Sequence, residues 1–205
     1  RPNPLYALRV RRCRVIGEER VIEHNDPGFR ANKTHVVVDW TRLWSVEEDR
    51  WCRNSAASSS FLRRHLEIPL DRDDVQDCEY EPKVRVALKE PLDAVFVQYR
   101  VTNVIHAVAP DYDPETDTRS VDLERTVHEM SWMYRKILLE WLRHADELLC
   151  HTLRLAPPHS SAMLGPYAAE HVELLVRALC LAVASLPHWA QRRLDAHPFH
   201  WIRPG

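Results

Sequence analysis

Apolar and polar residues alternate, or apolar residues run together for a few positions, over much of the chain up to residue 110. Residues 6–15 alternate apolar and basic side chains, which is the period of a strand with one buried face. Residues 34–39 (THVVVD) form a short β-branched run, which is typical of a fully buried strand. Similar short runs predict further strands at residues 20–23, 84–88, 94–99, 103–108 and 149–156.

Two long helices are predicted in the second half of the chain. Between residues 123 and 148 apolar side chains recur every three or four positions, and Asp122 is placed to cap the first turn. Residues 167–186 are apolar nearly all round, so this helix is predicted to be heavily buried, and Pro187 ends it. The remaining segment, residues 188–205, has no clear periodicity.

Strands that alternate with long helices predict an α/β fold, in which a sheet is covered on both faces. A chain of 205 residues fits one domain, and no linker divides it. We therefore expect a single domain over residues 1–205, with a core at about residues 6–187 and a C-terminal tail at residues 188–205.

Composition narrows the partners and the compartment. Lysine and arginine number 28 against 30 acidic residues, and the resulting net charge of -2 gives no support for nucleic-acid binding. No apolar run approaches the roughly 20 residues that span a bilayer, so no membrane partner is expected. The five cysteines are scattered and never form C-x-x-C, which favours a reducing, intracellular compartment, either the cytoplasm or the nucleus.

The residue types also exclude several kinds of site. Only 4 glycines occur against 14 prolines, and they are isolated, so neither G-x-G-x-x-G nor a P-loop can be written. The histidines near the C-terminus, His188, His197 and His200, lack a cysteine or carboxylate at ligand spacing, so no metal and no cofactor are predicted. No serine lies in G-x-S-x-G, which removes support for nucleophilic hydrolase chemistry.

Three separated stretches, in this order, resemble the macrodomain family of ADP-ribose-binding (Appr-1″-p processing-like) proteins. Residues 25–27 (Asn-Asp-Pro) followed by 35–39 (His-Val-Val-Val-Asp) are similar to the family's Gly-Asp-Ile/Leu and the buried strand after it, which ends in Asn. Residues 103–110 (NVIHAVAP) resemble its hydrophobic-Ile-His-Ala/Thr-Val-Gly-Pro strand, and residues 156–165 (APPHSSAMLG) align without gaps on its Phe-Pro-Ala-Ile-Ser-Thr-Gly-Ile-Phe-Gly. The resemblance implies a three-layer α/β/α sandwich around a mixed sheet of about six strands, with a ligand cleft at one end.

The resemblance also implies ligand contacts. The family's aspartate that accepts the adenine amino group corresponds to Asp26, for which a plain turn residue before Pro27 is the alternative interpretation. The pyrophosphate would need converging N–H groups from two loops. The corresponding residues are Ser58, Ser59 and Ser60 in one loop, and Ser160, Ser161, Ala162, Met163, Leu164 and Gly165 in the other.

The catalytic loop departs from the family. Its Asn-Ala-Ala-Asn corresponds to residues 39–42, Asp-Trp-Thr-Arg, so that Arg42 stands where the second asparagine positions the distal ribose in hydrolytic members. This change argues against hydrolysis by the family's route, and we expect no catalytic residue apart from Asp39, a weak candidate for activating a water and a candidate ligand contact. Trp40 and Trp44 are large enough to fill the cleft, and His106 is interpreted as a core histidine.

Three functions follow from these residues. The first is a module that binds ADP-ribose or an ADP-ribosylated protein. The second, held at nearly equal weight, is a scaffold of the same fold that binds a protein or a nucleic acid but no nucleotide. Trp189 and Trp201 beside Arg192, Arg193 and Arg203 could stack on bases, although packing on the domain or on a partner is the favoured interpretation. The third and least supported function is an ADP-ribosyl hydrolase with a changed loop.

Overall fold

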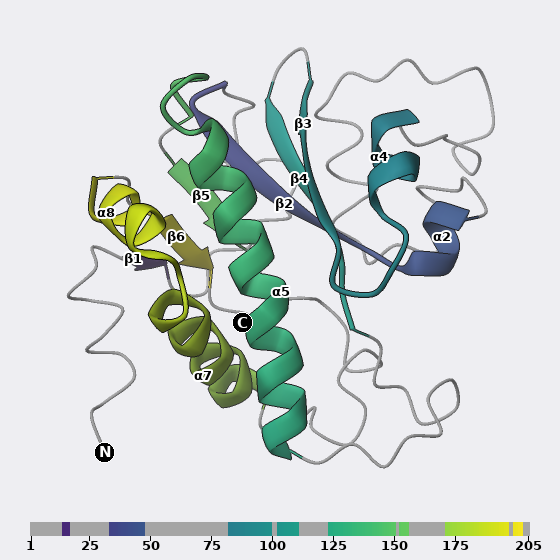
Figure 1. Ribbon diagram of the computed structural model, residues 1–205, viewed down its shortest axis with the longest axis vertical. Coiled ribbons are helices and arrows are strands. Elements are labelled where there is room, and N and C mark those ends of the chain that lie inside the picture. The colour runs from purple at the N-terminus through teal and green to yellow at the C-terminus, as the bar shows by residue number, and fades with distance from the viewer. Residues whose placement is uncertain are drawn as a thin grey trace.

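A mixed β-sheet covered by α-helices makes up the described part of the computed structural model (Figure 1). The structure describes residues 14–16, 33–47, 82–99, 102–110, 123–150, 152–155, 171–196 and 199–202. The α/β class predicted from the sequence is therefore confirmed. The predicted strand at residues 20–23 and most of the one at residues 6–15 lie outside the described residues.

The strands lie in the order β1-β6-β5-β2-β4-β3. Their bounds are β1 Arg14–Ile16, β2 His35–Thr41, β3 Ala94–Gln98, β4 Asn103–Val108, β5 Thr152–Leu155 and β6 Phe199–Ile202. Neighbouring strands are parallel except for β3, which is antiparallel to β4. β2 is central, because it pairs with β4 on one side and with β5 on the other.

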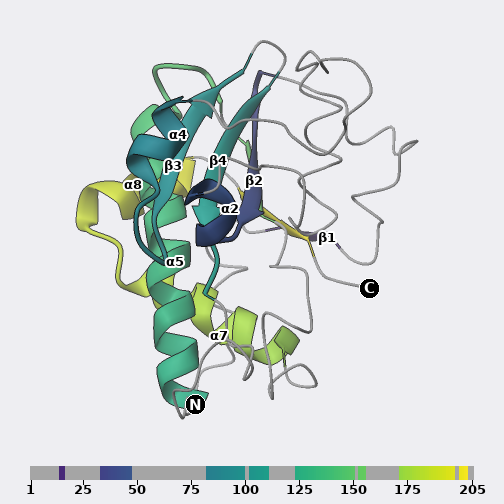
Figure 2. The ribbon, with the colours of Figure 1, turned by 90° about the vertical axis from the view of Figure 1, so that its right-hand side faces the viewer.

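The helices are α2 (Leu43–Glu47), α4 (Pro82–Ala87), α5 (Leu123–His144), α7 (His171–Ala184) and α8 (His188–Ala196). α5, α7 and α8 lie on one side of the sheet, whereas α2 and α4 lie beside β3 and β4 (Figure 2). No single described helix has the length and apolar character needed to cross a bilayer. One pair, Glu173–Ala184 with His188–Asp195, meets those criteria only together and bends by 114° at its break.

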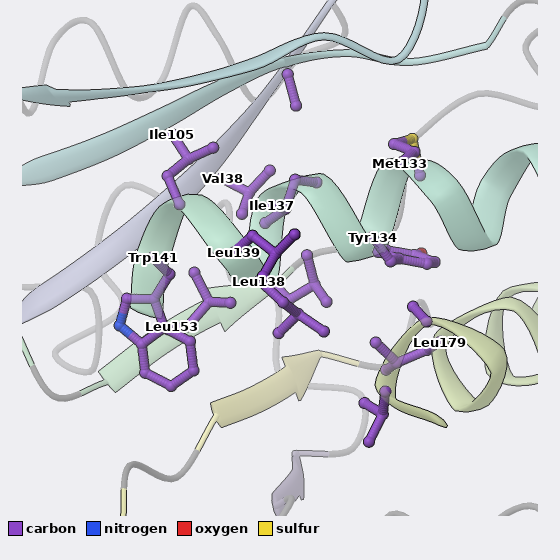
Figure 3. Close-up of a cluster of buried hydrophobic side chains, with 14 of the residues drawn as sticks. Val38, Ile105, Met133, Tyr134, Ile137, Leu138, Leu139, Trp141, Leu153 and Leu179 are labelled. Atoms are coloured by element: carbon purple, nitrogen blue, oxygen red, sulfur yellow. The ribbon is translucent and has the colours of Figure 1, made fainter. Parts of the chain in front are cut away.

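Strand alternation divides the buried side chains between two faces of the sheet. On one face, Val38, Ile105 and Leu153 point toward α5, where Ile137, Leu138 and Trp141 meet them, and Leu179 of α7 faces Tyr134 (Figure 3). On the other face, the next residues along the strands pack against α2 and α4. This smaller cluster consists of Val46, Val84, Leu88, Val95, Val97, Tyr99, Val104 and Val108.

Several predicted elements are confirmed closely. The predicted strand at residues 103–108 has the bounds of β4, and the strand predicted at residues 94–99 is β3. The helix predicted from residue 123 is α5, which buries the stripe that includes Val127, Met130, Tyr134, Ile137 and Trp141. α5 forms as predicted because its apolar period specifies one face, whereas β3 and β4 are short apolar runs that are buried on both faces.

The prediction of a strand at residues 84–88 is wrong, because this segment is the helix α4. Pro82 begins it, where the missing N–H of proline costs nothing. Strand alternation would bury Val84, Val86 and Leu88 together. Instead Val84 and Leu88, four residues apart, are 0% and 1% exposed, and Val86 is 74% exposed.

The segment after Pro187, in which the sequence shows no clear periodicity, contains regular structure. It contains α8, which buries Ala190 and Leu194 four residues apart, and the strand β6. Such a short helix carries too little periodicity to be recognised. β6 gains its partners from β1 and β5, which lie far away in the sequence.

Candidate functional site

The strand order places a topological switch point between β2 and β5. The chain that leaves β2 continues through α2 and α4 to β3 and β4, on one side of β2. The chain that leaves β5 continues through α7 and α8 to β6, on the other side (Figure 1). In open α/β sheets the crevice for a ligand forms at such a point, outside the carboxyl ends of the strands.

The residues predicted to bind a ligand follow these strand ends in the sequence. Residues 58–60 come after β2 and α2, and residues 160–165 come between the end of β5 at Leu155 and the start of α7 at His171. Asp26 follows β1. All of these residues lie outside the described part of the chain, so the structure places the strand ends that lead to them and not their side chains.

A chain of three buried polar side chains lies on the sheet face that packs against α2 and α4. Asp39 and His106 are register partners on β2 and β4, so their side chains point to the same face. His106 Nδ1 lies 2.8 Å from Asp39 Oδ2, and His106 Nε2 lies 2.8 Å from the Tyr99 hydroxyl. Asp39 and His106 are 0% exposed and Tyr99 is 7% exposed.

The chemistry of these groups sets the direction of their hydrogen bonds. An ionised carboxylate only accepts, so Nδ1–H of His106 donates to Asp39. In the neutral imidazole Nε2 is then an acceptor, and the Tyr99 hydroxyl donates to it. The interpretation of His106 as a core histidine is confirmed, because the ring is buried and both of its nitrogens are bonded.

Asp39, the weak catalytic candidate, is thus a buried carboxylate with one oxygen engaged by His106. Its roles in water activation and ligand contact stay predictions. Trp40, the next residue, points to the opposite face, where its ring packs edge-on against Tyr134 at a centroid distance of 6.1 Å. Arg42 is half-buried just before α2, and the side chain of Trp44 lies outside the description.

Sequence reasoning did not find the link between Asp39, His106 and Tyr99. Asp39 and His106 are polar residues inside apolar strands, and this was a usable signal because buried polar groups need partners. The signal for Tyr99 was weaker. It follows the last residue of β3, and only the β3–β4 pairing brings its hydroxyl to His106.

Metal and thiol chemistry gain no support from the described residues. Among them, no three His, Cys, Asp or Glu side chains are grouped so that they could hold a metal ion. Burial raises the pKa of the Cys150 and Cys180 thiols to about 11. Both thiols are therefore protonated near neutral pH and are weak nucleophiles.

Comparison with known proteins finds a likeness in structure but none in sequence. No family model matches the sequence, and no curated protein matches it. Among solved structures, the chain is similar to one described as "Alphavirus P23pro-zbd", with a TM-score of 0.49 and 12% sequence identity. The similarity covers 92% of this chain and 21% of that chain, so this chain spans about a fifth of its length.

Proposed function

We propose that the chain is a single macrodomain-like domain that binds ADP-ribose or an ADP-ribosylated protein and does not hydrolyse it. Its fold would be a three-layer α/β/α sandwich around a mixed sheet of about six strands, and its compartment intracellular. Asp26 would accept the adenine amino group, while residues 58–60 and 160–165 would hold the phosphates. This proposal rests on the sequence resemblance and on one structural observation, the switch point.

The switch point supports the proposal because it lies between the two strands that precede the predicted phosphate loops. β2 and β5 are parallel neighbours, with His35, Val36 and Val37 in register with Thr152, Leu153 and Arg154. Their carboxyl ends therefore meet at one edge of the sheet. The loops at residues 58–60 and 160–165 come after β2 and after β5 in the sequence, and this order supports a role for them at this edge.

The absence of hydrolysis is argued from the catalytic loop. Asp39 is 0% exposed and its Oδ2 is bonded to a buried histidine, so a water would have to enter the core to reach this carboxylate. Arg42 brings a cation in place of the family's second asparagine. Both features favour binding without turnover.

The test is titration calorimetry of the whole chain with ADP-ribose. We expect micromolar binding that Asp26→Ala weakens by at least about tenfold, because a buried adenine amino group loses its charged acceptor. Asp146→Ala is the matched control. It removes the same charge from a half-exposed aspartate in the turn before β5, at the amino edge of the sheet, and should bind like the wild type.

The other outcomes separate the alternatives. Absence of heat from the wild type and both variants would overturn nucleotide binding and favour the scaffold. Equal affinity of Asp26→Ala and the wild type would remove Asp26 from the site. Release of ADP-ribose from a modified protein would contradict the non-catalytic assignment.

A further inference from the structure

Two helices of the outer layer carry the same short pattern, a tryptophan followed three and four residues later by cations. In α5 it is Trp132-Met-Tyr-Arg135-Lys136, and in α8 it is Trp189-Ala-Gln-Arg192-Arg193. Residues three and four apart are neighbours on a helix surface, so both cations lie beside the indole. The Cζ atom of Arg135 is 5.5 Å from the Trp132 ring centroid, and that of Arg193 is 5.7 Å from the Trp189 ring centroid.

Both indoles are exposed although aromatic side chains of this size are usually buried. Trp132 is 48% exposed and Trp189 is 38% exposed, whereas Trp40 and Trp141 are 1% and 0% exposed. His128 meets the Trp132 ring edge-on, at a centroid distance of 6.3 Å. The residues three and four positions after each exposed indole are cations, and Glu129 lies three positions before Trp132.

Hydrogen bonds from the arginines place the two patterns on one surface. Arg135 Nε of α5 donates to Ser185 O, 3.2 Å away in the turn between α7 and α8. Arg193 Nη1 of α8 donates to Leu142 O of α5, 2.6 Å away. Figure 1 shows α5 and α8 on the same side of the sheet. We call this surface, made of Trp132, Arg135, Trp189 and Arg192, the tryptophan–arginine face.

The charges of this face are only partly compensated. Arg193 pairs with Asp146, and Lys136 pairs with Asp93. Arg135 and Arg192 form no ion pair with a carboxylate of the described residues. Each exposed ring therefore has one adjacent cation that is available to a ligand anion.

We propose that the tryptophan–arginine face binds single-stranded nucleic acid. Two indoles stack on two bases, and Arg135 and Arg192 contact the phosphates that flank them, which is how sequence-tolerant single-strand sites are built. The net charge of -2 does not steer nucleic acid to the chain, so binding is local and weak. The face lies on the outer side of the helices and not at the carboxyl edge of the sheet, so this inference is independent of the ADP-ribose proposal.

The test measures fluorescence anisotropy of labelled U12 RNA and T12 DNA with the whole chain at low ionic strength. Binding of either strand supports the inference, and the two arms distinguish RNA from DNA. The double variant Trp132→Leu/Trp189→Leu keeps apolar bulk but not the stacking rings, and should weaken binding at least about fivefold per tryptophan. Trp132→Phe/Trp189→Phe retains aromatic rings and should restore most of the affinity.

Salt dependence tests the arginines. For single strands, two phosphate contacts predict a slope of log affinity against log salt of about -1.4. Arg135→Gln/Arg192→Gln should bring that slope toward zero. Arg143→Gln is the control and should leave the slope unchanged, because Arg143 of α5 already pairs with Glu140.

Failure to bind either oligonucleotide, or equal binding by the leucine variant and the wild type, would overturn the inference. So would binding of an acidic peptide in place of the oligonucleotides. Each variant should unfold at the same urea concentration as the wild type, which separates loss of this face from loss of the fold.

Discussion

At the scale of single residues, His106 is a buried polar group that is bonded at both ring nitrogens. Two buried neighbours hold it, Asp39 of β2 at Nδ1 and Tyr99, which follows β3, at Nε2, each at 2.8 Å. A buried polar atom that loses its partner keeps its full cost of desolvation, about 1–3 kcal/mol.

A double-mutant cycle tests whether the three groups act as one unit. Tyr99→Phe leaves His106 Nε2 without its donor and should lower the free energy of unfolding by about 1–3 kcal/mol. Asp39→Asn should cost a similar amount, because a charge-assisted bond is lost. In urea unfolding the double variant should lose less free energy of unfolding than the sum of the two single variants. The second substitution acts on a hydrogen-bond network that the first has already disrupted. Strict additivity would show that the two bonds are independent.

At the scale of elements, the turn at residues 90–93 joins α4, β3 and α5. The Asp93 carboxylate accepts the N–H groups of Lys89 and Glu90 and pairs with Lys136 of α5 at 2.9 Å. Leu92 has a φ of 71°, a region that favours glycine, and its side chain packs against the main core. The Asp93 carboxylate therefore stabilises a turn in which Leu92 has a strained backbone.

Acid should weaken this turn. Burial by itself raises the pKa of Asp93, but the hydrogen bonds from Lys136, Glu90 and Lys89 outweigh it and hold the pKa below the ordinary value of 3.8. The folded state therefore binds this proton less tightly than the unfolded state. The contribution to stability is present above pH 3.8 and is lost as the pH falls through the lowered pKa.

Asp93→Asn should therefore be less stable than the wild type by about 1–2 kcal/mol near pH 7, and the difference should shrink on acidification to about pH 2.5. Urea unfolding at the two pH values measures it. Asp146→Asn is the control, because its ion pair with Arg193 is about half-exposed and should contribute little at either pH. A difference for Asp93→Asn that stays constant with pH would contradict the assignment.

At the scale of the whole molecule, the large core lies between the sheet and the helices α5 and α7, and the proposed ligand would bind at the carboxyl edge of the sheet. α5 and α7 pack against each other and close one face, so binding at the carboxyl edge would need no change in this core. What binding does need is a close approach of the backbone at residues 160–165, between β5 and α7. There Ala162 replaces a glycine of the resembling family.

Ala162→Gly should bind ADP-ribose about 5- to 30-fold more tightly than the wild type, because a positive φ costs a residue with a Cβ about 1–2 kcal/mol. Titration calorimetry measures the gain. Ala184→Gly, on the exposed end of α7, should leave the affinity unchanged and lower only the stability. A weaker or unchanged affinity for Ala162→Gly would mean that the phosphates are not bound by this loop.

The sequence by itself determined elements whose pattern is local, such as α5 with its stripe of apolar residues and β4, a short apolar run at Asn103–Val108. The sequence also predicted the candidate ligand-binding segments, because three stretches resemble a known family and occur in the same order as in that family. Only the tertiary structure decided that Pro82–Ala87 is a helix, that β6 lies between β1 and β5, and that Asp39 meets His106 across 67 residues. These features depend on contacts between distant segments, and a local pattern of hydrophobicity carries no information about its partner.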